Sequence, residues 1–324
     1  MTIDQRHRQH RRQLQRQALD LLEGFATADQ ALAPFTTYKL GGPALVLATP
    51  LDDEQLLLVA QAARATRLLV LAVGRGSNLL VADAGFPGIA ISLSSMADWV
   101  EFHDTVVHAG AAVALPVLAR RCAAAGLVGF EWAVGVPGSI GGAVRMNAGG
   151  HGSDMAACLE GAHVFDLRTA RRGWVAVEQL GLHFRGSGLA DHQLVLDARL
   201  QLQHGDADVA TATIAEIVRW RREHQPGGQN AGSVFVNPVP GELPAALLID
   251  QLGLRGFRVG GASVSDKHAN FIQAEEGATA ADVRAVMEHV RSTVMAATGV
   301  KLRSEVKLVG FDDLPTTEHA GVSL

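Results

Sequence analysis

The sequence is poor in cysteine and contains no long apolar run. Its two cysteines among 324 residues, Cys122 and Cys158, stand in neither a CxxC nor a CxxH pattern, which argues against a disulfide framework or a zinc site and is typical of a reducing compartment. We therefore expect two small buried side chains and no metal. No stretch approaches the roughly 18 uninterrupted apolar residues of a membrane helix, and the N-terminus lacks the apolar core of a secretory signal. The prediction is a cytoplasmic protein without membrane insertion.

An excess of positive charge is also absent. The formal net charge of −5 gives no reason to expect a nucleic-acid partner. Residues 1–16 are the exception, because they carry five arginines against one acid. Such a start is typical of an organellar transit peptide, or of a surface helix that has a solvated basic face and packs through its leucines. Because the run is short and rich in glutamine, we favour the surface helix.

Glycine, by contrast, is plentiful. Nine of the 27 residues from Gly126 to Gly152 are glycine, and apolar residues such as Val134, Ile140 and Val144 run between them, unlike in a flexible linker. Glycine lets the main chain approach a ligand closely or adopt a positive φ. This segment, residues 126–152, is called the glycine-rich segment below. It indicates main chain wrapped against a buried anionic cofactor.

A second glycine cluster follows the apolar run at residues 67–73, which predicts a short buried strand. Residues 74–78, GRGSN, are called the glycine turn, and consecutive N–H groups in such a turn can form a nest for phosphate oxygens. The turn is neither a Walker A loop nor a dinucleotide fingerprint, because Leu79 stands where the third glycine is needed. A plain tight turn is the alternative for either cluster taken alone.

The remaining pattern predicts an α+β chain. Residues 34–49 indicate a strand, a turn and a second strand, and a helix is expected at 52–66. A strand at 88–93, a strand pair at 106–115, a helix at 116–125 and three antiparallel strands within 162–202 come next. The last third predicts helices at 209–222, 243–252 and 280–298, and strands at 270–273 and 301–310.

The order of seven motifs resembles the UDP-N-acetylenolpyruvoylglucosamine reductase family. They are TTYKLGGPA, VGRGSNLL, FEWAVGVPGSIGGAVRMNAGG, FRGS, NAGSVFVNP, LIDQLGLRGFRVGGASVSDKHANFI and SEVKLVG, and they lie between Phe35 and Gly310. The resemblance implies an FAD-binding fold of the vanillyl-alcohol-oxidase type in two α+β subdomains, followed by a smaller α+β substrate-binding domain. We accordingly expect a basic helical extension at 1–30, the FAD-binding domain at 31–204, the substrate-binding domain at 205–310 and a mobile tail at 311–324.

The resemblance also implies the cofactor and the partners. FAD would be reduced by NADPH and would then reduce the enolpyruvyl group of UDP-N-acetylglucosamine enolpyruvate, giving UDP-N-acetylmuramate for peptidoglycan. The sequence does not fix the oligomeric state, and a monomer is the expectation. The residues that match the family's flavin-binding positions are Gly74, Arg75, Gly76, Ser77, Asn78, Pro137, Gly138, Ser139, Ile140, Gly141, Gly142, Asn147, Ala148 and Gly149.

Three residues match the family's catalytic positions. Ser233 would give a proton to the carbanion-like carbon, and Arg185 would bind the substrate carboxylate. Glu305 would lie beside the forming enolate, which requires a raised pKa. Without the resemblance, Ser233 would be interpreted as a loop serine and Arg185 as a surface arginine. Glu305 would belong to a row of exposed ion pairs along one face of a strand. The matching substrate-binding positions are Asn237, His224 and Lys267.

The chain departs from the family pattern in places. Its one tyrosine, Tyr38, lies far from the FRGS motif, and no insertion follows that motif, so the chain resembles the shorter family subtype. Val236 and His224 stand where lysine is common, so two alternatives follow: weaker substrate affinity, or binding of the substrate diphosphate by other groups, such as Lys267, Arg255 or Arg258. Two alternatives stay open: another flavoprotein of this fold with a different substrate, and a non-catalytic nucleotide-sugar-binding relative.

Overall fold

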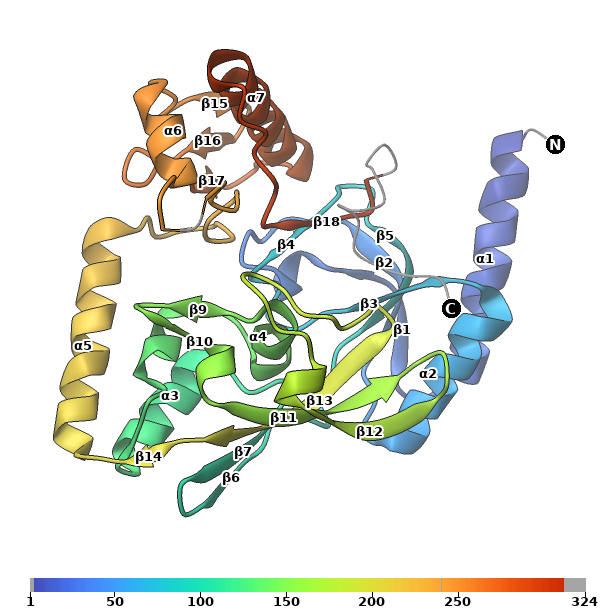
Figure 1. Ribbon diagram of the computed structural model, residues 1–324. Helices are drawn as coiled ribbons and strands as arrows, with labels where there is room; N and C mark the ends of the chain where they lie inside the picture. The colour runs from blue at the N-terminus through green and yellow to red at the C-terminus, as the bar shows by residue number, and fades with distance from the viewer. Residues whose placement is uncertain (1–2, 240, 312–324) are drawn as a thin grey trace.

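The computed structural model describes residues 3–239 and 241–311, and its first sheet lies near the N-terminus (Figure 1). The sheet has the order β1-β2-β5-β3, with strands at Ala26–Ala31, Pro43–Ala48, Phe86–Ile91 and Leu69–Ala72. β1 is antiparallel to β2, and the other pairings are parallel. Helices α1 (Ile3–Leu21) and α2 (Asp53–Thr66) pack together and share a buried core with this sheet. The sheet therefore begins before residue 31.

The strand expected at the start of residues 34–49 is wrong. Pro34 lies in a short 3-10 helix, η1 (Ala33–Phe35), and the strand that pairs with β2 lies earlier, at β1. Tyr38 is the reason that the intervening chain leaves the sheet. Its ring is fully buried, and its hydroxyl donates to the carbonyl of Ile272 at 3.1 Å, far along the chain. This contact ties the segment to the C-terminal lobe.

The second sheet is antiparallel throughout and confirms the three strands predicted within residues 162–202. Its order is β12-β11-β13-β7-β6, with strands at Arg171–Ala176, Leu159–Asp166, Gln193–Gln201, Val106–Gly110 and Val100–His103. The strand pair predicted across residues 106–115 is wrong. Only residues 106–110 form a strand there, and the hairpin partner precedes it, because the chain turns at Asp104 with a φ of 53°.

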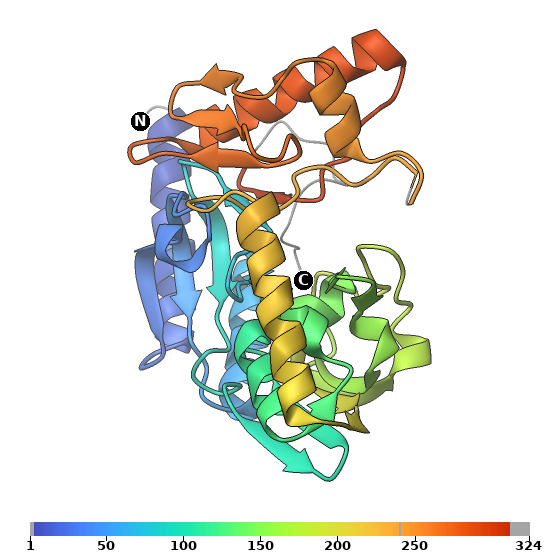
Figure 2. The same ribbon diagram turned by 90° about the vertical axis from the view of Figure 1, so that its left-hand side faces the viewer.

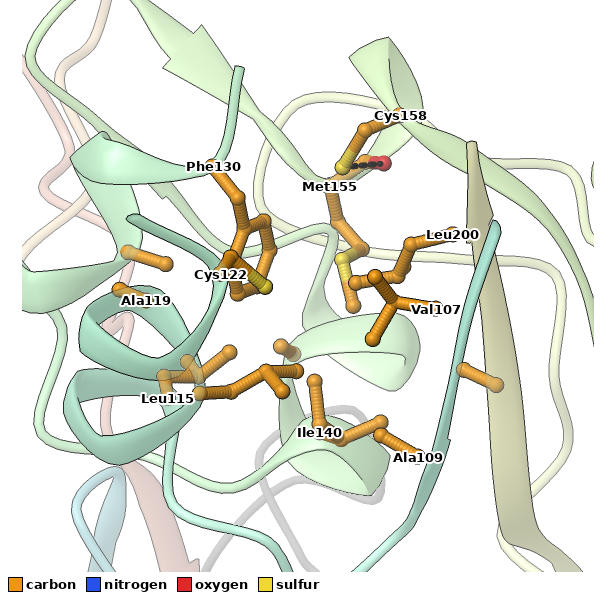
Figure 3. Close-up of a cluster of buried hydrophobic side chains, with 14 of the residues drawn as sticks. Val107, Ala109, Leu115, Ala119, Cys122, Phe130, Ile140, Met155, Cys158 and Leu200 are labelled. Carbon is orange, nitrogen blue, oxygen red and sulfur yellow. Dashed lines mark hydrogen bonds between the residues drawn. The ribbon is translucent and has the colours of Figure 1, made fainter. Parts of the chain in front are cut away.

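Helices α3 (Leu115–Ala124) and α4 (Ile140–Met146) share a buried core with the inner face of this sheet. Figure 3 shows Val107 and Leu200 from the strands directed toward Ile140 and Cys122 from the helices. Both cysteines are buried as predicted, and burial raises the pKa of each thiol to about 12. Two short strand pairs flank this core: β8 (Leu127–Val128) with β14 (Gln203–His204), and β9 (Gly149–Gly150) with β10 (Ser153–Asp154).

Helix α5 (Ala207–His224) leads from this body to the C-terminal lobe, as both views show (Figures 1 and 2). The lobe holds α6 (Ala245–Gln251), α7 (Ala280–Thr298) and the sheet β15-β16-β17 at Arg258–Val259, Ala262–Val264 and Ile272–Ala274. All three predicted helices are confirmed. Thr279 starts α7 with a reciprocal capping box, in which its hydroxyl accepts from the Asp282 N–H at 3.0 Å. Within the described ranges, no helix is long and apolar enough to cross a membrane.

The chain finally returns to the first body. β18 (Lys307–Val309) pairs in parallel with β4 (Leu79–Val81), directly after the glycine turn. Only three residues of the strand predicted at 301–310 are therefore regular strand. The tail predicted from residue 311 is wrong at its first residue, because the Phe311 ring is buried against the C-terminal core and the Arg284 guanidinium lies 5.0 Å from its centre. Residues 312–324 lie outside the described residues.

Candidate active site

The glycine turn presents a row of free donors. Among the described residues, no acceptor pairs with the N–H groups of Gly74, Arg75, Gly76, Ser77 and Asn78. Gly76 has a φ of 56°, and a Cβ there would lie 2.1 Å from the carbonyl oxygen of Phe35, so only glycine fits. The hydroxyl oxygen of the neighbouring Thr37 is buried without a hydrogen bond. These donors form the nest that the sequence predicts, and it suits a phosphate group.

The glycine-rich segment meets this nest. A Cβ on Gly74 would lie 2.8 Å from the Ser139 hydroxyl, and a Cβ on Gly138 would lie 3.5 Å from the Ser77 hydroxyl. Ser139 is the N-cap residue of α4, and the first two N–H groups of that helix are already used, because Ile140 donates to the Val113 carbonyl at 3.0 Å and Gly141 donates to the Ala111 carbonyl at 2.9 Å. A Cβ on Gly142, in the same turn, would meet only Ser139 within 4 Å. The glycine turn and the start of α4 therefore lie side by side, and we propose that they border one FAD pyrophosphate.

Asn147 fixes the far end of α4. It is buried in the left-handed conformation, and its side-chain oxygen accepts from the Ala156 N–H at 3.0 Å. Its amide donates to the Asp154 carboxylate at 3.2 Å and to the His183 carbonyl at 3.3 Å. All of these partners are within the protein, and the Ala148 N–H and carbonyl are likewise paired with Ala143 and Met155, so the polar groups of these two residues stabilise the loop itself. Their contact with a flavin ring stays a prediction.

Arg185 and Glu305 form an ion pair beside that main chain. The Arg185 Nε lies 3.2 Å from a Glu305 carboxylate oxygen, and its Nη1 donates to the Gly149 carbonyl at 3.0 Å. The Glu305 side chain is only 19% exposed. The alternative interpretation, in which Glu305 belongs to an exposed row of ion pairs along its strand, is therefore wrong. Burial raises the pKa of Glu305, and Arg185 and Arg303 oppose that rise. The raised pKa predicted from the sequence is confirmed.

Ser233 lies on the segment that runs alongside Glu305. The Glu305 N–H donates to the Val234 carbonyl at 2.8 Å, and the Val236 N–H donates to the Arg303 carbonyl at 2.9 Å. Ser233 itself is bridged to Phe271 on its other side. Its hydroxyl is half-buried and makes no hydrogen bond with any described residue. The Ser233 segment therefore runs beside Glu305, which pairs with Arg185, and the three residues come from distant parts of the sequence.

Sequence reasoning missed Asn270, which holds this segment in place. Its buried side chain accepts from the Phe235 N–H at 2.9 Å and donates to the Phe235 carbonyl at 2.8 Å. The one sequence signal for Asn270 was its position in the KHANFI motif. The local pattern does not distinguish a buried asparagine that binds both main-chain groups of another residue from an exposed one.

The predicted substrate-binding residues lie at the junction between α5 and the C-terminal lobe. His224 is exposed at the end of α5 and stacks on Trp220, with 4.6 Å between ring centres. The Lys267 ammonium donates to the Arg222 carbonyl. Lys267 lines a cavity of about 500 Å³, to which His224 does not contribute. Its lining residues are Val134, Val218, Arg221, Arg222, Gln225, Pro226, Gly227 and Lys267. Arg221 and Arg222 are cationic lining residues that the sequence analysis did not name.

Other residues considered for substrate binding are occupied or buried. The Asn237 side-chain oxygen accepts from the Ala245 N–H at 3.0 Å at the start of α6, which leaves its amide for a ligand. Arg255 pairs with Asp250 and Arg258 with Glu275. Val236 is 7% exposed, so its side chain is part of the packed interior. Of the cations proposed for the diphosphate, Lys267 is the one that lines the cavity.

Free main-chain donors of the glycine turn, with an arginine–glutamate pair next to the Gly149 carbonyl, suit a flavin-dependent oxidoreductase. Comparison with known proteins agrees. Residues 44–170 match the FAD binding domain family, and residues 224–309 match the family described as UDP-N-acetylenolpyruvoylglucosamine reductase, C-terminal domain.

Relatives of full length give the particular family. The reductase of this name from Heliobacterium modesticaldum is 41% identical over 87% of this chain and 90% of its own length, and that of Bacillus subtilis is 36% identical over 89% and 95%. The crystal structure of the reductase from Thermus caldophilus superposes with a TM-score of 0.73 at 34% identity, over 88% of this chain and 98% of that one. The chain belongs to the UDP-N-acetylenolpyruvoylglucosamine reductase family.

Proposed function

We propose that this protein reduces the enolpyruvyl group of UDP-N-acetylglucosamine enolpyruvate to the lactyl ether of UDP-N-acetylmuramate, with NADPH as the reductant. Family membership supports the reaction and its place in peptidoglycan synthesis. The observation that carries it is the meeting of Arg185 and Glu305, 3.2 Å apart, next to the Ser233 segment and the glycine main chain. We propose the cytoplasm as its location and a monomer as its form, and a role in cell shape and division follows from the product.

FAD, when bound, would supply the hydride transfer between NADPH and the terminal carbon of the enol ether. Arg185 then has one task, which is to hold the substrate carboxylate as negative charge moves onto it. Its Nε and Nη1 are taken by Glu305 and Gly149, and Nη2 has no partner among the described residues. We infer that Nη2 is the first donor to the substrate carboxylate.

Glu305 and Ser233 handle protons. A Glu305 that keeps its proton at higher pH than an ordinary glutamate donates a hydrogen bond to the enolate and releases the Arg185 Nε for the substrate. Ser233, whose hydroxyl is free, gives its proton to the carbon next to the carboxylate. We propose that Lys267, with the neighbouring arginines of the cavity, binds the diphosphate, and that Asn237 and His224 border the substrate.

An anaerobic half-reaction experiment tests this proposal. The purified yellow protein should bleach on addition of NADPH and regain its colour when UDP-N-acetylglucosamine enolpyruvate is added. Ser233→Ala should slow recovery of the colour by about 10²–10⁴-fold and leave bleaching unchanged. Ser263→Ala, on β16, is the matched control.

The other outcomes identify the alternatives. Protein that binds no FAD would contradict the flavoenzyme assignment. Protein that bleaches but stays reduced with this substrate would indicate a flavoprotein with a different acceptor, and binding of the substrate without bleaching would indicate a non-catalytic relative.

A further inference from the structure

A second polar cluster lies on the outer face of the five-stranded sheet, away from the nest. His108 on β7, His163 on β11 and Asp197 on β13 come from three adjacent strands. Val107 and Ala109 point into the core on the inner face, as Figure 3 shows, so His108 between them points to the other side. None of these residues belongs to the proposed catalytic machinery.

The geometry of the cluster is that of a ligand set. One carboxylate oxygen of Asp197 lies 2.8 Å from the His108 Nε2 and 2.8 Å from the His163 Nδ1. These three atoms all lie within 4.8 Å of one another. The Asp197 side chain is 1% exposed, whereas the two imidazoles are 24% and 31% exposed. Over the described ranges, this is the one group of three such side chains with that spacing.

The surroundings hold the three side chains in place. The second carboxylate oxygen of Asp197 accepts from the Arg172 Nη2 at 3.0 Å, and Arg172 also reaches Asp53 at 3.1 Å. Trp99 meets the His108 ring edge to face at 4.7 Å between centres, and Trp174 meets the His163 ring at 5.1 Å. A carboxylate fixed through its other oxygen and imidazoles fixed by packing are the usual support of a metal ligand.

We propose that His108, His163 and Asp197 bind one transition-metal ion of the zinc type. Two imidazole nitrogens and one carboxylate oxygen suit Zn²⁺ in tetrahedral geometry, with water as the fourth ligand. Zinc bonds of about 2.0–2.1 Å separate tetrahedral ligands by about 3.3 Å, so the present 2.8 Å contacts must open by about 0.5 Å. Without the ion, the ring nitrogen that faces Asp197 carries the proton of the hydrogen bond to the carboxylate. On metal binding that nitrogen gives its proton to water and the other ring nitrogen takes one up, so each imidazole stays neutral and no redox step is involved.

The ion has a structural task. It joins β7, β13 and β11 on one face of the sheet, and α4, whose N-terminus borders the nest, packs on the other face. Metal binding therefore stabilises the folded flavoprotein without entering the reaction. The Arg172 guanidinium pairs with the second carboxylate oxygen of Asp197 and partly neutralises the negative charge of that side chain. This limits the affinity for the metal ion but leaves the first carboxylate oxygen available as a ligand.

Titration of Zn²⁺ into the chelator-treated, FAD-loaded full chain without an affinity tag tests the proposal. Isothermal calorimetry should give one Zn²⁺ per chain, and the thermal midpoint should rise. His108→Gln and His163→Gln should each weaken binding at least tenfold. Because both histidines are partly exposed, these variants should fold, which FAD content verifies, whereas Asp197 is too buried for a clean test.

The matched control is the double variant His103→Gln/His204→Gln, which removes two exposed histidines that each contact a single acid, Glu101 or Asp104. It should bind Zn²⁺ as the wild type does. The proposal is overturned if the wild type binds no Zn²⁺, if both cluster variants bind it as tightly as the wild type, or if only the control loses binding.

Discussion

The side-chain amide of Asn78 donates a hydrogen bond to the main-chain carbonyl of Glu305 at 3.1 Å, across 227 positions of sequence. In return, the Lys307 N–H donates to the Asn78 carbonyl at 2.9 Å. The last residue of the glycine turn is thus fixed to the strand that carries Glu305. If the proposed roles hold, cofactor binding and acid catalysis depend on this one pair of hydrogen bonds.

Asn78→Asp should weaken this junction. The variant places a carboxylate oxygen against the Glu305 carbonyl, so a donor is lost and two acceptors face each other, at a cost of about 1–3 kcal/mol. We expect weaker FAD retention and a lower thermal midpoint, measured by fluorescence titration of released flavin and by calorimetry. Gln201→Glu, which removes an exposed amide donor to Thr105 on the second sheet, is the control. Equal effects of the two substitutions would contradict the prediction.

Gly74→Ala should separate the two glycine segments. Its Cβ would lie 2.8 Å from the hydroxyl of buried Ser139, so one segment has to move. We expect FAD affinity to fall at least tenfold, which corresponds to about 1.4 kcal/mol. Gly173→Ala on β12 meets nothing within 4 Å and should bind FAD normally. Unchanged FAD affinity in Gly74→Ala would show that the nest does not hold the pyrophosphate.

Asn270→Ala should reduce both stability and proton delivery. It leaves the buried N–H and carbonyl of Phe235 unpaired, which costs about 1–3 kcal/mol and loosens the segment that carries Ser233. We expect slower flavin reoxidation by substrate at an unchanged rate of reduction by NADPH. Val264→Ala, a buried substitution in the same lobe, should lower the thermal midpoint without slowing reoxidation. If both variants slow reoxidation equally, the clamp has no specific role.

Glu305→Gln should change the pH dependence of stability. Because burial raises the native pKa of Glu305, its stabilising contribution is present below the unfolded pKa of about 4.3 and is lost as the pH rises through the native pKa. The thermal midpoint of Glu305→Gln relative to that of the wild type should therefore rise as the pH increases from about 4 through the native pKa of Glu305.

Glu275 provides a control of opposite sign. Its hydrogen bond to Arg258 lowers the pKa of Glu275, so its contribution is present above the unfolded pKa and is lost on acidification. Glu275→Gln should lose stability relative to the wild type over the same rise in pH, and only slightly because the pair is exposed. The same slope in both variants would contradict the assignment of Glu305.

Local patterns were sufficient where local interactions decide the structure. Thr279 caps α7 as its position predicts, and the alternating strands within residues 162–202 form as expected. The errors at residues 34–40 and at Phe311 have one cause. Tyr38 and Phe311 are drawn into the core of the C-terminal lobe, a contact that no short window of sequence contains.

The site shows the same division. Motif order predicts Ser233, Arg185 and Glu305 for one site. The structure pairs Arg185 with Glu305 and runs the Ser233 segment beside Glu305, and their chemistry stays a prediction. Asn270 and the cluster of His108, His163 and Asp197 were missed, because each depends on pairing between distant strands rather than on spacing. A register shift between His163 and Val164 also breaks the alternation that would have marked the outer face.

The pairing of β4 with β18 bears on synthesis of the protein. β4 follows the glycine turn directly and has no other strand partner in the described sheets, so its strand pairing is completed only after residues 307–309 have left the ribosome. Closing so long a loop is also slow in folding. We therefore expect firm retention of the yellow cofactor to require synthesis of residues 307–309.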